Sequence, residues 1–278
     1  MTLQEDKAEF GNCGTGERIK QELAYQAERA AQIGDINSTP RYIIERYRKS
    51  KLWWVFYKEY MFKQIGDLNE KEVLDFGCGE GELSTQLAKL GARVTGIDIS
   101  PELIQIAKKR AHMDGVLDRT DFIVGEITQS PLAKNRFDII VCYAVLHHVD
   151  IHSVLPLVIA SLKKGGMAII IEPLALSPIL RRVRDLVPVG TDASPGEHPL
   201  DKEDLDLIIG SLSSCRIRFF DLFGRFQILF PNRNRIDKGH SFTKAALVFL
   251  GTLDYVLLSV FPFLSRFCGE AVIVGRKP

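Results

Sequence analysis

A glycine-rich segment follows a short apolar run that contains an acidic residue. Asp75 precedes Gly77, Gly79 and Gly81, and residues 83–90 have the pattern of a helix. Residues without a Cβ let the backbone turn sharply and pass close to a ligand. A buried strand that leads through a glycine loop into a helix N-terminus is typical of nucleotide-binding α/β folds. The spacing therefore predicts a nucleotide-like cofactor at this loop.

The charge of the loop narrows the choice of cofactor. The third residue after Gly79 is Glu82, so the dinucleotide pattern G-x-G-x-x-G lacks its last glycine. Asp75 and Glu80 would repel a pyrophosphate, whereas they would attract a cofactor with a cationic sulfonium and an amino group. Asp98 closes the next apolar run, where a carboxylate can accept hydrogen bonds from both ribose hydroxyls. These residues favour a sulfonium cofactor over a nicotinamide dinucleotide.

Two adjacent histidines are candidates for acid–base chemistry. His147 and His148 follow the apolar run 137–142, and open α/β sheets bind ligands beyond the carboxyl ends of their strands. Histidine titrates near neutrality, so either ring could take a proton from an acceptor hydroxyl. Packing at the following helix is the alternative for both. Glu172 could orient an acceptor or pair with an arginine, and His198 is a weaker candidate that more simply ends a loop.

The elements that would position these residues alternate short apolar runs with helices. Helices are predicted at 82–90, 101–112, 154–162 and 201–213. Strands are predicted at 73–76, 93–98, 121–124, 137–142, 167–171, 216–220 and 271–276. The first five strand runs are apolar almost throughout, as in parallel strands that are covered on both faces. This order predicts an α/β fold.

Additions flank this pattern at both ends. Residues 1–65 are predicted to form a helical N-terminal cap, with helices at 17–31 and 42–62 whose aromatic residues pack rather than bind. Residues 66–278 would form the core, with insertions at 174–200 and 221–269.

The second insertion contains an apolar stretch, residues 245–264, that is long enough to span a bilayer. Asp254 at its centre makes spanning costly, and a spanning helix would leave the final strand on the wrong side. We therefore expect a buried or capping helix. Two basic clusters suit anionic lipid or a hydrophobic acceptor with a phosphate or carboxylate, although a solvated face is the simpler interpretation of either cluster alone. The clusters are Arg181, Arg182 and Arg184, and Arg233, Arg235 and Lys238.

Composition excludes several classes of function. A net charge of +1 with 26% charged residues gives no electrostatic signal for nucleic acid. The five cysteines form no C-x-x-C pair, which favours reduced thiols and a cytoplasmic location, and no metal-ligand cluster is evident. The N-terminus lacks the apolar region of a secretory signal. A hydrolase elbow of the G-x-S-x-G type is also absent from the sequence.

From about residue 72 to residue 173 the sequence resembles the class I S-adenosylmethionine-dependent methyltransferases. Five signals occur in the expected order: Asp75-x-Gly77-x-Gly79, Asp98, Gly125-Glu126-Ile127, Phe137-Asp138-Ile139-Ile140 and Leu162-Lys163-Lys164-Gly165-Gly166. The segment Leu146-His147-His148-Val149 is similar to the small-molecule branch that includes ubiquinone and menaquinone biosynthesis methyltransferases. The resemblance implies a Rossmann-like, seven-stranded, mostly parallel sheet whose last strand is antiparallel.

The resemblance also implies the cofactor S-adenosyl-L-methionine, with S-adenosyl-L-homocysteine as product. It assigns cofactor contacts to a set of residues: Asp75, Gly77, Cys78, Gly79, Asp98, Ile99, Glu126, Ile127, Cys142 and Tyr143. The glycine loop would pass along the methionyl part, with Asp75 beneath it, and Cys142 and Tyr143 would approach the methionine end.

The nucleoside end of the cofactor would contact two segments. Asp98 would hold the ribose, and Ile99 would pack on the adenine. Glu126, where the family more often has Asp, would face the adenine amino group, and Ile127 would cover the ring. No metal ligand is implied.

The implied reaction moves a methyl group to a small, hydrophobic or lipid-like acceptor, with an oxygen atom favoured. Methyl transfer is an in-line displacement, so the protein mainly aligns the reactants and excludes water. A base, for which His147 and His148 are the candidates, is needed only when the acceptor enters protonated. A non-catalytic S-adenosylmethionine-binding regulator and, less favoured, an NAD-dependent oxidoreductase are the alternatives. Peripheral membrane contact stays open, and no nucleic-acid partner is expected.

Overall fold

The computed structural model describes residues 15–129, 132–177, 198–223 and 241–278. Seven strands form one sheet in the order β3-β2-β1-β4-β5-β7-β6. Strands β1 to β5 pair in parallel, and β7 runs antiparallel to both of its neighbours, β5 and β6. The bounds are β1 Glu72–Phe76, β2 Arg93–Asp98, β3 Thr120–Val124, β4 Phe137–Tyr143, β5 Leu162–Pro173, β6 Ser213–Phe220 and β7 Glu270–Arg276. The predicted sheet, with an antiparallel last strand, is confirmed.

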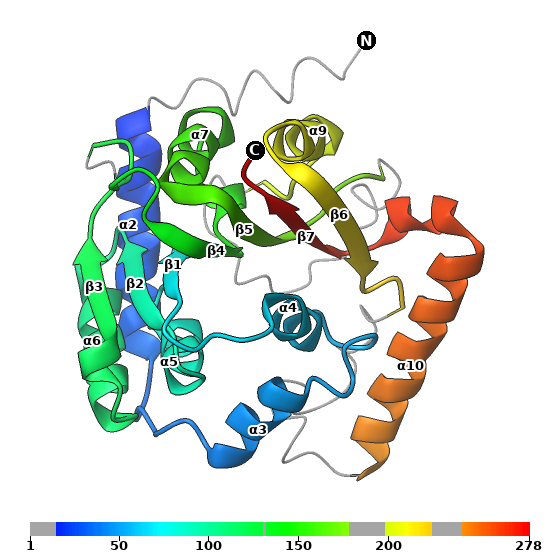
Figure 1. The fold of residues 1–278 in the computed structure, drawn as a ribbon, viewed down its shortest axis with the longest axis horizontal. Coiled ribbons are helices and arrows are strands. Elements are labelled where there is room, and N and C mark those ends of the chain that lie inside the picture. The colour runs from blue at the N-terminus through cyan, green and yellow to red at the C-terminus, as the bar shows by residue number, and fades with distance from the viewer. Residues whose placement is uncertain (1–14, 130–131, 178–197, 224–240) are drawn as a thin grey trace.

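Helices cover both faces of this sheet (Figure 1). On one face lie α3 (Arg41–Lys49), α4 (Tyr57–Ile65), α5 (Glu82–Lys89) and α6 (Pro101–Met113). On the other lie α7 (Ile151–Ser161) and α9 (Lys202–Gly210). Alternate residues of each central strand feed the two cores: Val73 and Val141 face the first layer, and Leu74 and Ile140 face the second. All four are fully buried, as the near-continuous apolar runs predict.

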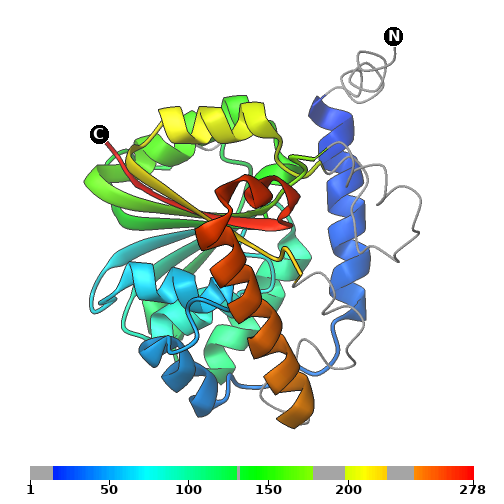
Figure 2. The ribbon, with the colours of Figure 1, turned by 90° about the vertical axis from the view of Figure 1, so that its right-hand side faces the viewer.

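Two further helices lie at the margins of the sheet. Helix α2 (Thr15–Gln32) packs on α6 and stands beside the carboxyl ends of the parallel strands (Figure 2). Helix α10 (Ser241–Val260) lies along the opposite side of the molecule, next to β6. The short 3-10 helix η5 (Pro262–Phe267) then leads into β7. Helices α2 and α10 thus lie on different sides of one sheet, and the division of the chain into a cap and a core stays a prediction.

The single helix predicted over 42–62 is wrong. Helix α3 ends at Ser50, whose φ of 41° is left-handed and whose hydroxyl donates to the carbonyl of Tyr47 at 2.6 Å. Helix α4 starts only at Tyr57. The break sends the intervening turn toward α10, because the Trp54 indole N–H donates to the Thr252 hydroxyl at 3.2 Å. Sequence pattern missed it because the segment contains neither glycine nor proline.

A buried carboxylate fastens the N-terminal helices to the core. Asp114, at the end of α6, accepts hydrogen bonds from Ser38, from the backbone and hydroxyl of Thr39, and from the Lys89 ammonium at 2.7 Å. Burial opposes ionisation, but these donors outweigh it and lower the pKa of Asp114 to about 2. The loop between α2 and α3 is therefore pinned to the layer that covers the sheet.

The apolar stretch 245–264 forms α10 and the start of η5, and it is not buried as expected. Only 17% of residues 243–260 lie inside the protein. By length and composition this helix could cross a membrane, and among the described residues it alone passes that test. It instead caps the edge of the sheet, which agrees with the other half of the expectation. The two basic clusters at 181–184 and 233–238 lie outside the described residues.

Candidate active site

The glycine loop leaves β1 at the carboxyl edge of the sheet, as predicted. Gly77, Gly79 and Gly81 have φ of 73°, 50° and 75°, values that favour residues without a side chain. A Cβ on Gly77 would lie 2.3 Å from Cγ2 of Val145, so the loop packs closely on the chain after β4. A Cβ on Gly79 would meet nothing within 4 Å. The loop is thus tight beneath and open above, which leaves room for a ligand beside its backbone.

Asp75 lies under this loop with 1% of its surface exposed. The Ser84 hydroxyl, one turn into α5, donates to its carboxylate at 2.6 Å. Burial raises the pKa of Asp75 to about 6, and the nearby charge of Asp98 acts in the same direction. A cation at the loop would reverse this effect, because it would favour the ionised form. The chemistry of the site therefore fits a positively charged ligand.

Asp98 ends β2 and faces the same loop. Its carboxylate accepts the backbone N–H of Gly79 at 2.8 Å and that of Ser100 at 3.0 Å. Burial raises the pKa of Asp98, and the charge of Glu22 on α2 adds to the shift. Ile99 is half-buried beside it. Asp98 thus anchors the loop from below while α2 approaches from the open side.

The segment after β3 lies beside the end of β2, since the Gly125 N–H donates to the Asp98 carbonyl at 2.9 Å. The Glu126 carboxylate accepts hydrogen bonds from the hydroxyl of Thr128 and the amide of Gln129. Ile127 is buried with its side chain in the core, so only its main chain can line the site. The structure brings this segment to the predicted place, and the adenine contacts of Glu126 and Ile127 stay predictions.

Two of the predicted cysteine contacts have inaccessible side chains. Cys78 and Cys142 are 8% and 1% exposed, and burial raises the pKa of both thiols well above the usual value. Cys142 points into the core beneath α7. Each of these two residues can therefore contact a cofactor only through its main chain. The four cysteines among the described residues are all free thiols.

Tyr143, at the end of β4, meets side chains from α4 that sequence analysis assigned to packing. The Tyr57 hydroxyl lies 3.4 Å from that of Tyr143, and the Lys58 ammonium lies 5.6 Å from the Tyr143 ring centroid. Tyr143 and burial together raise the pKa of Tyr57 well above its usual value. Lys58 also donates to Glu82 at 3.0 Å, directly after the glycine loop. The aromatic crowding of 42–62 was the available signal that the N-terminal helices reach this edge.

His147 and Glu172 form a buried pair at the same edge. His147 lies in the 3-10 turn η2 (Leu146–His148), and its Nδ1 is 2.6 Å from Oε2 of Glu172, the penultimate residue of β5. The other oxygen of Glu172 accepts the backbone N–H groups of Val145 and Leu146 at 2.9 and 2.7 Å. Glu172 thus holds both the turn and the ring. Because the carboxylate accepts from Nδ1–H, the Nε2 nitrogen of His147 is left to exchange a proton.

His148 lies against His147, with ring centroids 4.0 Å apart and the ring planes tilted by 39°. Its Nδ1 lies 3.4 Å from Glu22 of α2. His198 is exposed and reaches this region through its backbone, which donates to the His147 carbonyl at 3.1 Å. Both rings thus lie against a buried acid, and the contact of His147 with Glu172 at 2.6 Å is the shorter of the two.

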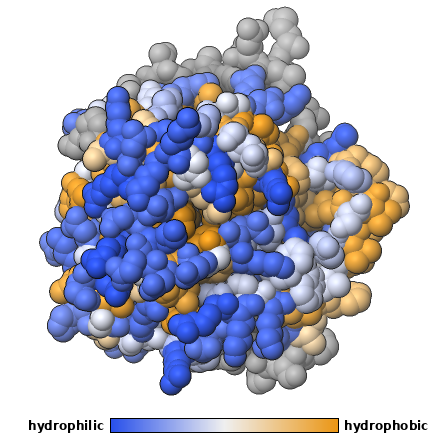
Figure 3. Space-filling view, in the orientation of Figure 1, coloured by the Kyte–Doolittle hydropathy of each residue, from blue (hydrophilic) through white to orange (hydrophobic). Residues whose placement is uncertain are grey.

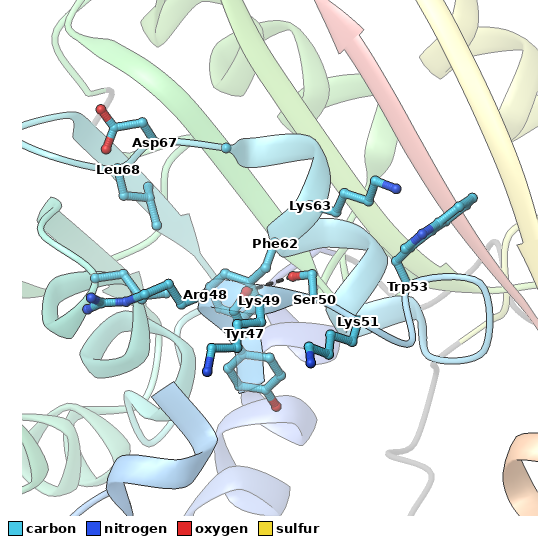
Figure 4. A pocket seen from close by; sticks show the side chains of 12 residues that line it. Tyr47, Arg48, Lys49, Ser50, Lys51, Trp53, Phe62, Lys63, Asp67 and Leu68 are labelled. Carbon is cyan, nitrogen blue, oxygen red and sulfur yellow. Dashed lines mark hydrogen bonds between the residues drawn. The ribbon is translucent and has the colours of Figure 1, made fainter. Parts of the chain in front are cut away.

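A separate cavity of about 700 Å³ lies below α3 and α4 (Figure 4). Leu68 and Leu90, which line it, precede β1 and β2, so it opens at the amino ends of the strands. Its basic residues, among them Arg48, Lys49 and Lys63, lie in the last turns of α3 and α4, where positive charge complements a helix dipole. The predicted site residues gather at the other edge.

Comparison with known proteins agrees with this geometry. A protein-family profile described as "Methyltransferase domain" matches residues 74–170. The mitochondrial ubiquinone biosynthesis O-methyltransferase of Schizosaccharomyces pombe is 43% identical over 91 residues, which cover 32% of this chain and 33% of that protein. The ubiquinone biosynthesis O-methyltransferase of Histophilus somni is 40% identical over 113 residues, which cover 39% of this chain and 48% of that protein. The chain thus matches half or less of these relatives' length.

A solved structure extends the likeness in fold. Geranyl diphosphate C-methyltransferase of Streptomyces coelicolor aligns with 94% of this chain and 98% of its own, with a TM-score of 0.61 at 12% identity. At this identity the likeness concerns the fold alone. The match of residues 74–170 to the methyltransferase domain family confirms the resemblance of this part of the chain to class I S-adenosylmethionine-dependent methyltransferases.

Proposed function

We propose that the chain is an S-adenosyl-L-methionine-dependent O-methyltransferase with a small, hydrophobic or lipid-like acceptor. The observation that carries this proposal is the pair of carboxylates, buried Asp75 and half-buried Asp98, around a loop that is open beside Gly79. The methyltransferase domain match supports the reaction class. The residues fit the cofactor, because ionised carboxylates favour a sulfonium and disfavour a pyrophosphate.

When bound, S-adenosyl-L-methionine supplies a methyl group that its sulfonium charge has already activated. The chain would hold that charge over Asp75 and the ribose at Asp98, while Tyr57 and Tyr143 close the methionine end. A preorganised site of this kind lowers the barrier by orienting the reactants and excluding water.

An acceptor hydroxyl must also lose its proton. His147 would take it at Nε2, since Nδ1–H is bound to Glu172. The Glu172 carboxylate would then stabilise the resulting imidazolium at a distance of 2.6 Å. His148, whose ring lies against that of His147, is the second candidate of the pair. This arrangement suits a phenol or quinol, whose hydroxyl becomes a better nucleophile on deprotonation.

The acceptor class and location are part of the proposal. The curated relatives are named for ubiquinone biosynthesis, which supports a quinol-like acceptor. Such a molecule partitions into lipid, so we place the protein in the cytoplasm, in peripheral contact with the inner face of a membrane. No nucleic-acid partner is proposed, because the net charge is +1.

Calorimetry with S-adenosyl-L-methionine, S-adenosyl-L-homocysteine and NAD tests the cofactor. Binding of the first two and not of NAD is expected, and failure of both to bind would sink the proposal. Asp98→Ala should weaken binding by about 100-fold, because a hydrogen bond to a charged group contributes roughly 1.5–3 kcal/mol. Asp121→Ala removes an exposed carboxylate at β3 and is the matched control. Unchanged affinity in Asp98→Ala would refute the ribose contact.

The two alternatives make different predictions in the same experiments. A non-catalytic regulator would bind the cofactor and transfer no methyl group to quinol or catechol acceptors. The paired His147 and Glu172 argue against it, since a buried acid fixes the ring tautomer. A nicotinamide-dependent oxidoreductase would bind NAD, which Glu82 in place of the third glycine disfavours.

A further inference from the structure

The outward face of α10 carries apolar side chains where a surface helix ordinarily carries polar ones. Phe249, Val256 and Val260 are 67%, 49% and 61% exposed, and their spacing puts them on one side of the helix. Phe261 and Phe263 extend this face past the helix end. We call these five residues the α10 stripe. Figure 3 shows hydrophobic surface gathered on the side of the molecule where Figure 1 places α10.

Charged residues are arranged so that none interrupts the stripe. Residues 243–265 contain two charges, Lys244 and Asp254. Asp254 is turned inward, 5% exposed, and accepts the backbone N–H groups of Leu222 and Phe223 at 3.1 and 2.9 Å. Lys244, near the start, and Arg266, just after the stripe, are both exposed. The surface is therefore apolar along its length and positive at each end, which complements an anionic lipid surface.

The inner side of α10 is fastened to the turn between α3 and α4, so the stripe is held outward. Thr252 accepts the Trp54 indole N–H, and Gly251 approaches so closely that a Cβ there would lie 2.6 Å from Cγ1 of Val55. Tyr255 packs edge-on against Trp53, with ring centroids 6.0 Å apart. Amphipathic aromatic rings of this kind favour the boundary between lipid and water. The aromatic group therefore flanks the stripe where headgroups would lie.

Contacts along its length exclude a spanning role for this helix. Gly251, Thr252 and Tyr255 in the middle of α10 pack on the turn between α3 and α4, and η5 leads directly from the end of α10 into β7. A helix of 20 residues is about 30 Å long, enough to lie flat along an interface. The helix would therefore rest in the plane of the headgroups, with the stripe facing the acyl chains.

The stripe also adjoins the acceptor side of the site. A cavity of about 340 Å³ lies between β6 and α10, with Phe220, Tyr255 and Pro262 in its walls. Phe220 packs edge-on against Tyr57, which meets Tyr143 at the end of β4. A continuous run of aromatic side chains thus leads from the edge of the stripe to the predicted methionine end of the cofactor.

We propose that the α10 stripe docks the protein onto an anionic lipid surface, from which a lipid-dissolved acceptor reaches the cavity beside β6. The purpose of the surface rests on the proposed function, whereas its geometry does not. A second copy of the chain is the competing occupant, and charge disfavours it. In a two-fold contact across the stripe, the basic residues at its ends, Lys244 and Arg266, would face basic residues of the second copy. Residues 243–265 contain no exposed acid that could pair with them.

Co-sedimentation with vesicles tests this docking surface. The full chain is expected to bind vesicles of phosphatidylcholine with phosphatidylglycerol more strongly than phosphatidylcholine alone, with binding that falls as salt rises. The triple variant Phe249→Ser/Val256→Ser/Val260→Ser should lower the partition coefficient by at least about tenfold, because three large apolar side chains no longer enter the interface. Lys244→Glu/Arg266→Glu should lower binding to the anionic vesicles alone.

The control removes exposed apolar side chains from the opposite side of the molecule. Met113→Ser/Leu117→Ser changes the last residue of α6 and a residue in the turn that follows it, 42% and 47% exposed, and it should bind vesicles as the unmodified chain does. Calorimetry with S-adenosyl-L-methionine on every variant separates loss of docking from loss of the proposed function. Docking is overturned if the unmodified chain binds cofactor but not vesicles, or if the triple variant still binds vesicles. If light scattering showed a dimer for the unmodified chain and a monomer for the triple variant, and neither bound vesicles, the stripe would instead be a contact with a second copy.

Discussion

Two buried carboxylates, one at the carboxyl edge of the sheet and one in the C-terminal addition, both accept two consecutive backbone N–H groups, yet they have different roles. Glu172, in β5, accepts the N–H groups of Val145 and Leu146 where the chain leaves β4. Asp254, in α10, accepts those of Leu222 and Phe223 where the chain leaves β6. In both places a carboxylate satisfies backbone donors that a strand end would otherwise leave unpaired.

The difference lies in how the oxygens are shared. Glu172 serves both N–H groups with one oxygen and gives the other to His147 at 2.6 Å. Asp254 gives one oxygen to each N–H, so its visible role is to fix α10 against the sheet. A strand-end carboxylate becomes part of a reactive site when the geometry spares an oxygen for a titratable ring. We therefore expect mutation of Glu172 to act mainly on turnover and mutation of Asp254 to act mainly on stability.

The largest effect is expected from replacing the Glu172 oxygen that contacts His147. In Glu172→Gln the amide oxygen must serve the two backbone N–H groups, which turns the amide N–H₂ toward His147 Nδ1. Nδ1 then has to accept, so Nε2 carries the proton and cannot act as a base. Turnover should fall by about 10²- to 10⁴-fold, as should that of His147→Ala. The measurement is methyl transfer to 3,4-dihydroxybenzoate or short-chain quinols.

The control for this prediction is His148→Ala, which leaves the Glu172–His147 pair intact and should keep more activity than either variant. Affinity for S-adenosyl-L-methionine should change little in all three, because none removes a loop or ribose contact. Full activity in both His147→Ala and Glu172→Gln would contradict a base role and leave simple alignment as the mechanism.

The matching change in the addition should act on stability instead. Asp254→Ala removes the carboxylate that accepts the N–H groups of the half-buried residues Leu222 and Phe223, and each hydrogen bond to a charged group contributes roughly 1.5–3 kcal/mol, less where water replaces it. The free energy of unfolding in urea should therefore fall by about 2–4 kcal/mol. Asp254→Asn keeps one acceptor oxygen and should lose less. Cofactor affinity that fell together with stability would show that the two regions are coupled.

Short-range sequence pattern predicted most of the elements and residue positions at the carboxyl edge of the sheet. Strand β2 spans 93–98 as predicted, and the glycines after β1 have the positive φ values that their spacing implies. Asp98 and His147 also lie at the carboxyl ends of their strands. Their placement follows from a rule for parallel sheets that needs no knowledge of distant contacts. Whether each residue touches the cofactor stays a prediction.

The additions could not be predicted in the same way, because distant contacts decide their geometry. Ser50 adopts a left-handed conformation, although no glycine or proline near it in the sequence predicts a helix end. Tyr57 reaches Tyr143 across the fold, and Trp54 meets Thr252. The apolar composition of α10 suggested burial, yet its outer face is open. Composition indicates that an apolar face must be covered, without indicating by what.

A third buried carboxylate extends the comparison to a group whose charge the ligand itself would set. Burial raises the pKa of Asp75 to about 6. A bound sulfonium would lower it, so cofactor binding should release a proton from Asp75 at pH values near and below 6, and affinity should rise with pH. Between about pH 5.5 and about pH 7.5 we expect an increase of about threefold, the size that linkage gives for a pKa lowered by one to two units. Asp75→Asn removes the titrating group and should flatten this profile across the same range. Calorimetry in two buffers of different ionisation enthalpy measures the affinity and the released proton together. A variant that kept the full pH dependence would assign it to another group, such as a histidine at the same edge.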